Sequence, residues 1–437
     1  MKNLIKFTAA ILYFGSLVFS AHAKFSSIYV FGDTLSDTST NNAGSSGYLY
    51  CGKRYTNGRT WVEVLAQRQG LLGSNSIIST NWAFSSNNIS FYGQSSAILV
   101  TNVANFAAPT NATNCLFVVW VNNADFVLDM NDNAIGNPSS APNNGTNLAN
   151  WTTAINLHIT NQFKVITNLF AKGCRTLVAP NAADVTTVPQ FNSNRSSNYL
   201  AFVRQRIITY NTGFTAMLKQ INNSPSYAGL MVYSPDIFSL LNSVLTNAAS
   251  YGLTNALANQ GTGAGLQPVS VIGAYSAGAL ANANLNGPGT NYIFWGDTGD
   301  PTAKFHAVIA DIVQQMISPV QINGLTQTNG SNRLDVVNMP VGLSGFLDGS
   351  TNLAQANWTL VTNISSLNTA QSIFVSTPPL PADFGSGGLS GSGGSGGSGG
   401  PPNPGSGSVT NGSVGTNSFN SAAQFYRLRF PYAWNWP

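Results

Sequence analysis

Ionisable side chains are scarce in this sequence. Asp, Glu, Lys and Arg make up 7% of the 437 residues, against about a quarter in a typical globular protein. Hydrophobic residues reach 43% and aromatic residues 11%, so the chain is not a disordered polar one. The formal charge is +4 and falls to +2 without residues 1–23, which contain two Lys and no acid. So small an excess of positive charge gives no indication of nucleic-acid binding.

Cysteine is also rare, which excludes a disulfide scaffold. The three cysteines, Cys51, Cys115 and Cys174, can form one intrachain disulfide at most. The sequence contains no C-x-x-C motif and no cluster of His and Cys, so we expect no metal site. Cys115 opens an apolar run and Cys174 follows a glycine at a predicted helix end, which predicts that both are small buried residues.

Long hydrophobic runs are missing except at the N-terminus. Lys2 and Lys6 precede an apolar run over residues 7–19, and an A-x-A signature follows at residues 21–23. This pattern predicts a secretory signal peptide over residues 1–23, with a buried N-terminal helix as the alternative. We therefore expect a secreted, periplasmic or cell-surface protein. No later run is long enough to span a bilayer.

Short apolar runs alternate with helical segments from about residue 25 to residue 319. The runs are rich in β-branched residues and do not alternate with polar ones, as in strands buried on both faces of a parallel sheet. We predict strands at 28–31, 116–121, 176–179 and 230–233, and helices at 59–69, 150–172, 198–220 and 302–317. Alternating strands and helices predict an α/β fold of three layers, α/β/α, with a parallel sheet and right-handed crossovers.

The pattern changes beyond residue 323. Strands without intervening helices are predicted at 357–362, 372–376 and 425–430. They indicate a small antiparallel β module over residues 323–437, interrupted by a flexible Gly/Ser/Pro-rich insertion at 385–415. A stabilising or spacing role is favoured for this module over a binding role.

Four motifs occur in an order that resembles the GDSL (SGNH) family of ester hydrolases. The motifs lie within the predicted α/β domain, residues 24–322. A further stretch of this domain, RYTNGRTWVE at 54–63, is also similar to one common in the family. The motifs are YVFGDTLSD at 29–37, NWAFSS at 81–86, FVVWVNNADF at 117–126 and FWGDTGDPT at 294–302. The resemblance implies a flavodoxin-like α/β/α domain that hydrolyses esters without a metal or cofactor.

The resemblance also implies catalytic positions, and several carry unexpected residues. In the family a Ser attacks the ester, a His accepts its proton and an Asp orients the His. Thr34 stands at the Ser position, Asp300 at the His position and Asp297 at the position of the orienting acid. Of the oxyanion-hole positions, the Gly corresponds to Ser85 or Ser86 and the Asn to Ala124.

These substitutions weaken the expected chemistry to different degrees. Thr34 keeps a hydroxyl but is bulkier and stiffer than Ser. Ala124 lacks a side-chain donor, a loss typically worth about 3–4 kcal/mol in the transition state. Asn123 would replace that donor if the loop were shifted. A carboxylate such as Asp300 is a poor base at an ordinary pKa. Asp300 would act as a base only if it shared a proton with Asp297 in a dyad. The alternative role for Asp300 is structural, as the N-cap of the last helix.

Neither histidine after residue 23 is expected to replace the missing base. His306 follows Asp300 by six residues, about 9 Å further along the helix. His158 lies in the middle of a predicted helix, outside every motif, where it is expected to serve helix packing or to lie at the surface.

Three functions follow from these observations. The first is an ester hydrolase, acting on small-molecule or glycan esters, with weak or no turnover. The second is a pseudoenzyme that binds esters, acylated glycans or a partner protein in the retained cleft. The third is a structural surface protein. The substrate is not predicted, because loops without a local signature determine specificity in this fold. The sequence does not predict the oligomeric state either.

Overall fold

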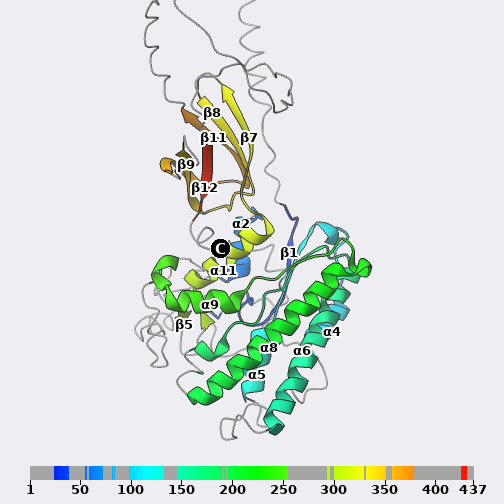
Figure 1. The fold of residues 1–437 in the computed structure, drawn as a ribbon. Coiled ribbons are helices and arrows are strands. Elements are labelled where there is room, and N and C mark those ends of the chain that lie inside the picture. The colour runs from blue at the N-terminus through cyan, green and yellow to red at the C-terminus, as the bar shows by residue number, and fades with distance from the viewer. Residues whose placement is uncertain are drawn as a thin grey trace, which may run out of the picture.

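The structure is a computed structural model. It describes residues 24–38, 55–56, 59–71, 81, 83, 98–131, 145–188, 191, 195–253, 293–295, 300–328, 331–350, 357–376 and 425–430 (Figure 1). The expected signal peptide, the insertion at 385–415, Cys51, Ser85, Ser86 and Asp297 lie outside these residues.

A parallel sheet of four strands forms the centre of the α/β part. The strands are β1 (Ile28–Gly32), β2 (Leu116–Trp120), β3 (Thr176–Val178) and β4 (Met231–Tyr233), and they pair in this order. All three pairings are parallel, with Leu116 between Ile28 and Thr176, and Thr176 opposite Met231. The predicted strands and their parallel arrangement are therefore confirmed.

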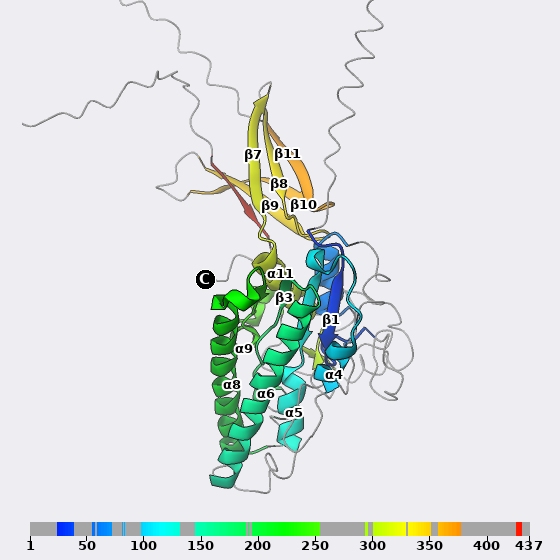
Figure 2. The ribbon, with the colours of Figure 1, turned by 90° about the vertical axis from the view of Figure 1, so that its right-hand side faces the viewer.

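Helices cover both faces of this sheet (Figure 2). Helices α4 (Ile98–Asn105), α5 (Asn122–Asn131), α6 (Gly145–Ala171) and α8 (Ser197–Asn223) lie on one face, and α2 (Trp61–Arg68), α9 (Ile237–Thr246) and α11 (Ala303–Ile317) on the other. Short 3-10 helices occupy Ala112–Asn114, Val185–Thr187, Pro225–Tyr227 and Ala248–Tyr251. The four predicted helices are present, whereas α4, α5 and α9 were not predicted.

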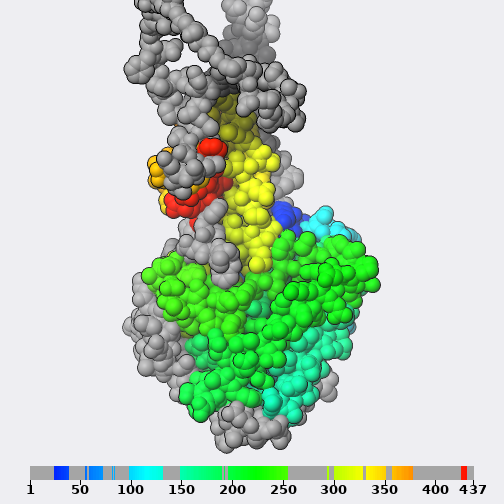
Figure 3. Space-filling view, in the orientation of Figure 1, coloured from blue at the N-terminus to red at the C-terminus, as the bar shows by residue number. Residues whose placement is uncertain are grey.

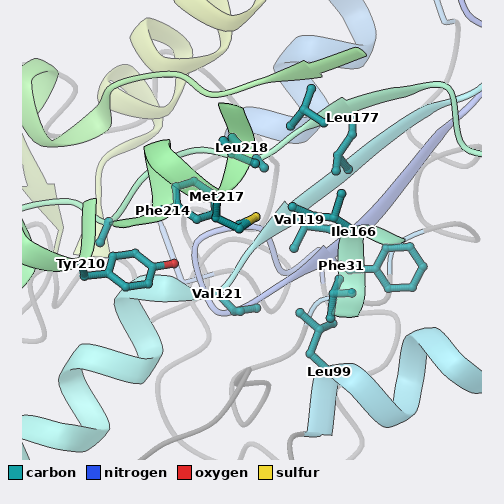
Figure 4. Close-up of a cluster of buried hydrophobic side chains, with 14 of the residues drawn as sticks. Phe31, Leu99, Val119, Val121, Ile166, Leu177, Tyr210, Phe214, Met217 and Leu218 are labelled. Atoms are coloured by element: carbon teal, nitrogen blue, oxygen red, sulfur yellow. The ribbon is translucent and has the colours of Figure 1, made fainter. Parts of the chain in front are cut away.

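Alternation along the strands creates the two cores. Successive side chains of a strand point to opposite faces of the sheet. Phe31 and Val119 therefore belong to the core beneath α4, α6 and α8, while Val30 and Val118 belong to the core beneath α2, α9 and α11. Figure 4 shows part of the first core, where Phe31 and Val119 meet residues of the covering helices. The continuous apolar runs of β1 and β2 follow from this burial on both sides.

The segment before α11 differs from the prediction. Asp300 and Pro301 form β6, which pairs antiparallel with β5 (Phe294–Trp295). The helix begins at Ala303, and its N-cap is Thr302, whose side chain accepts a hydrogen bond from the Phe305 N–H. The expectation that Asp300 caps this helix is wrong, because the Thr302 hydroxyl already accepts that hydrogen bond.

The C-terminal strands form two sheets of three strands each. One has the order β11 (Ala370–Ser376), β8 (Ser331–Val337), β7 (Gln321–Thr328), and the other the order β10 (Thr359–Ser365), β9 (Ser344–Ser350), β12 (Phe425–Arg429). All pairings are antiparallel, and side chains from both sheets share one apolar core. This part is a small β-sandwich. Its first strand begins two residues before the expected boundary at 323.

The sandwich lies next to α2 and α11 (Figure 1). The Arg68 Nε donates to Asp311 Oδ1 at 2.6 Å, and both side chains are 3% exposed. The same guanidinium donates to the Val341 carbonyl, and the Val341 N–H donates to the Arg68 carbonyl. Arg68 thus joins α2, α11 and the loop after β8.

In the part of the chain that the structure describes, no helix combines the length and the apolar character that a bilayer crossing needs.

Candidate functional site at the carboxyl edge of the sheet

A tight turn follows β1 and presents Thr34 at the edge of the sheet. The Ser36 N–H donates to the Asp33 carbonyl, and the Asp33 N–H to the Trp120 carbonyl of β2. A Cβ on Gly32 would lie 2.7 Å from the Ser36 Cβ, so only glycine fits before this turn. Thr34 is half-buried, and its hydroxyl makes no hydrogen bond to any described residue. Thr34 therefore lies at the edge of the sheet where open α/β folds bind ligands.

The buried Asp33 side chain stabilises this turn through hydrogen bonds. Its carboxylate oxygens accept hydrogen bonds from the N–H of Leu35 at 3.0 Å and from the N–H of Ala124 at 3.3 Å. Burial raises the pKa of the Asp33 carboxyl to about 7; the two N–H donors oppose the rise, and the negative charge of Asp300 adds to it. Because Asp300 acts on Asp33 through its charge, the segment before α11 lies near the end of β1.

The second motif meets the same turn from the far side of β1. Asn81 forms a parallel bridge with Val30, so this residue lies on the edge of β1 that β2 does not occupy. The Asn81 amide donates to the Ser36 carbonyl at 2.8 Å and to the Thr38 hydroxyl at 3.0 Å, and its oxygen accepts from the Ala83 N–H. These contacts join residues of the first two motifs.

The third motif contributes the start of α5, where successive residues face different strands. The Ala124 N–H donates to Asp33 on the β1 side. The Asn123 Oδ1 accepts from the Ala183 N–H at 2.8 Å, in the loop after β3, and the Asn123 Nδ2 is buried without a described partner. The hydrogen bond that Asn123 makes with a described residue therefore points toward β3. Its use as an oxyanion donor for Thr34 stays a prediction, as does the use of the Ala124 position.

Both described histidines are buried in the helical layers. His306 is 1% exposed on α11, and burial lowers its pKa to about 3. The His158 Nε2 lies 3.4 Å from Asp129 Oδ2, and the His158 ring packs edge-on against Phe126 and Tyr210. The expectation of helix packing for His158 is confirmed. His158 lies beneath α6 and α8, and His306 on the opposite side of the sheet.

Cysteine thiols and acidic side chains are potential metal ligands in the part of the chain that the structure describes. Cys115 and Cys174 are free and buried, as predicted, and burial raises the pKa of Cys174 to about 12. Among the described residues, no group of three or more His, Cys, Asp or Glu side chains is arranged to hold a metal ion.

No protein-family model and no curated protein matches the chain.

Asp33 was not predicted from the sequence as a titrating group. The signal for it was present, since Asp33 directly follows a strand that is buried on both faces. A carboxyl group in that position loses its hydration, which raises its pKa.

Proposed function

We propose that the chain is a GDSL-type ester hydrolase with weak turnover, in which Thr34 is the nucleophile. The observation that supports it most is the meeting of motif residues at one sheet edge. Asn81 bonds the turn after β1, Ala124 bonds Asp33 within that turn, and Asp300 acts on Asp33 electrostatically. Residues distant in the sequence thus meet at the turn that carries Thr34, which supports the proposal.

The backbone at Thr34 offers part of an oxyanion site. Among the described residues, no group accepts a hydrogen bond from the Thr34 N–H. An ester whose carbonyl carbon approached the Thr34 hydroxyl would place its oxygen near this donor. The hydroxyl attacks, its proton passes to a base, and the tetrahedral intermediate then expels the alcohol and leaves an acyl-Thr34 ester that water hydrolyses.

The weak step is the removal of the hydroxyl proton. A positioned base contributes about 10²–10⁴-fold to such reactions. Both described imidazoles are buried within the helical layers. Asp300 is half-buried and raises the Asp33 pKa through its charge, which supports a role for it as the base. A carboxylate is a weak base for a hydroxyl group, which limits the rate.

The test is hydrolysis of a short-chain aryl ester by the chain from Lys24 onward. We expect slow turnover that Thr34→Ala abolishes. The combination Thr34→Ser with Asp300→His should raise the rate by about 10-fold or more, because it restores a stronger base. Thr326→Ala, on the exposed strand β7, is the matched control and should not change the rate. A rate that persists in Thr34→Ala would show that Thr34 is not the nucleophile.

The buried histidines favour a second candidate, an ester-binding protein without turnover. Here the same edge binds esters or acylated glycans, and no proton is removed. The distinguishing result is binding of a non-hydrolysed ester, weakened by bulky substitution of Thr34, in a protein that shows no turnover.

A further inference from the structure

We propose that the outer face of the β10–β9–β12 sheet is a binding site for an anionic polysaccharide. Alternation along the strands places four side chains on this face. Leu347 and Leu428 point into the sandwich core, so their neighbours Phe346, Asp348, Arg427 and Arg429 point outward. Arg427 pairs in register with Asp348, and Arg429 with Phe346. We call these four residues and Trp358 the arginine platform.

A single carboxylate holds both arginines in place. Asp348 Oδ2 accepts from the Nε of Arg427 and of Arg429, each at 3.0 Å, and Oδ1 accepts from the Arg429 Nη2 at 3.3 Å. The Arg427 guanidinium lies 4.5 Å from the centre of the Trp358 ring, and that of Arg429 lies 4.6 Å from the Phe346 ring. Stacking and ion pairing thus order side chains that would otherwise lose rotamer entropy on binding a ligand.

The two arginines of the platform carry more positive charge than Asp348 neutralises. Two guanidinium groups share one carboxylate, and the Asp348 side chain is 3% exposed, whereas those of Arg427 and Arg429 are 41% and 43% exposed. Most of the N–H groups of these two arginines have no hydrogen-bond partner among the described residues. In a chain with 7% charged residues, this is a concentrated site for carboxylate or sulfate groups, which a guanidinium binds through two parallel hydrogen bonds. The β12 residues, in red, lie at the surface in Figure 3.

The spacing and the neighbours favour a polymer of sugars. Arg427 and Arg429 are two residues apart on one strand and converge on Asp348, whose Oδ2 lies 3.0 Å from both Nε atoms. Their remaining N–H groups therefore form one patch, and a chain that repeats its anionic group binds such a patch more tightly than a single small anion, because a neighbouring repeat rebinds at high effective concentration. Leu360 pairs with Asp348 across the sheet and is 56% exposed, which offers an aliphatic surface to the C–H face of a sugar ring. Guanidinium groups already lie over the Trp358 and Phe346 rings. The covered faces of these aromatic rings are therefore not available for the stacking that nucleobases require.

Binding of polygalacturonate and of dextran sulfate to the full chain tests this site, with neutral dextran as the ligand control. We expect binding to at least one polyanion, which weakens as salt rises and is absent for neutral dextran. Arg427→Gln with Arg429→Gln should weaken it at least 10-fold. The double Arg→Lys variant should also weaken it, because Lys keeps the charge but not the planar pair of donors.

Arg333→Gln is the matched control, since Arg333 also pairs with a carboxylate, Asp335, but belongs to the other sheet. It should bind like the parent, and melting curves of all variants show whether the sandwich is folded. The proposal is overturned if neither polyanion binds, if a folded double Gln variant binds as well as the parent, or if Arg333→Gln loses as much affinity. Tighter binding of single-stranded DNA through the same two arginines would also overturn it, in favour of a nucleic-acid site.

Discussion

His306 lies in the first turns of α11 with its imidazole almost completely buried. Its Nδ1 has no hydrogen-bond partner among the described residues, and burial lowers its pKa to about 3. In the unfolded chain the residue titrates near 6.5. The unfolded state therefore binds a proton between pH 6.5 and pH 3 that the folded state does not bind, and stability falls as the pH falls through this range.

Replacing His306 by Gln should remove this dependence. Relative to pH 7, we expect the parent protein to lose about 2 kcal/mol more than His306→Gln at pH 5, because pH 5 lies about 1.5 units below the unfolded pKa and each unit corresponds to about 1.36 kcal/mol. Urea unfolding of both proteins at the two pH values measures the difference. Asp33 has a raised pKa, so its contribution to stability is lost as the pH rises toward 7. Because Asp33 is present in both proteins, this contribution cancels in the comparison. Equal losses in both proteins would contradict the assignment to His306.

Helices α2 and α11 are joined by an ion pair that lies out of contact with water. Burial raises the pKa of the Asp311 carboxyl, and the Arg68 guanidinium opposes this. Beside the pair, Gln69 donates to Gln314, whose own amide donates to the Ser318 carbonyl. These side chains form a polar layer between two helices that otherwise meet through apolar residues.

Removing one partner of this pair should be costly. Arg68→Ala leaves the Asp311 carboxylate buried and unpaired, and should reduce the free energy of unfolding by about 3–5 kcal/mol. Arg68→Met with Asp311→Leu removes both charges and should cost much less, because no buried charge remains. Chemical denaturation of the three proteins gives the comparison. A double variant as unstable as Arg68→Ala would indicate that packing of the Arg68 stem is what matters.

The α/β part and the β-sandwich meet over a close joint. Gly342 has φ +78°, and a Cβ on it would lie 2.4 Å from the Gln67 side chain of α2. Its N–H donates to the Ser366 carbonyl, which holds the loop after β8 against the sandwich. Together with the contacts of Arg68, this joint couples the two parts.

The whole molecule should therefore unfold in one calorimetric transition, and Gly342→Ala should separate it into two or lower its midpoint. The reason is the strain of a side chain at this φ, to which the displacement of the flexible Gln67 side chain adds little. Gly324→Ala is the control, because a Cβ there meets only Asp335, at 3.5 Å or more. A parent protein that already melts in two steps would show that the joint does not couple the parts.

The sequence by itself determined the elements whose signal is local. The continuous apolar runs of β1 and β2 and the long apolar stripe of α6 predict their own structure, because burial on both faces or on one stripe leaves a direct pattern. Strand β8 carried an equally direct alternation, with Leu334 and Val336 buried between half-buried residues, which the reading overlooked. The alternation in residues 425–430 likewise places Arg427 and Arg429 on one face.

Only the tertiary structure decided the features that depend on distant partners. Asp300 has the local pattern of an N-cap, but pairing of β6 with β5 leaves that role to Thr302. Strand β9 contains Gly345 and Gly349, which weaken a strand pattern; the close approach of Phe430 to Gly345 explains one of them. The raised pKa of Asp33 follows from its burial by distant segments, and the direction of the Asn123 side chain follows from its hydrogen bond with the Ala183 N–H. Such contacts join residues far apart in the chain, and no local pattern records them.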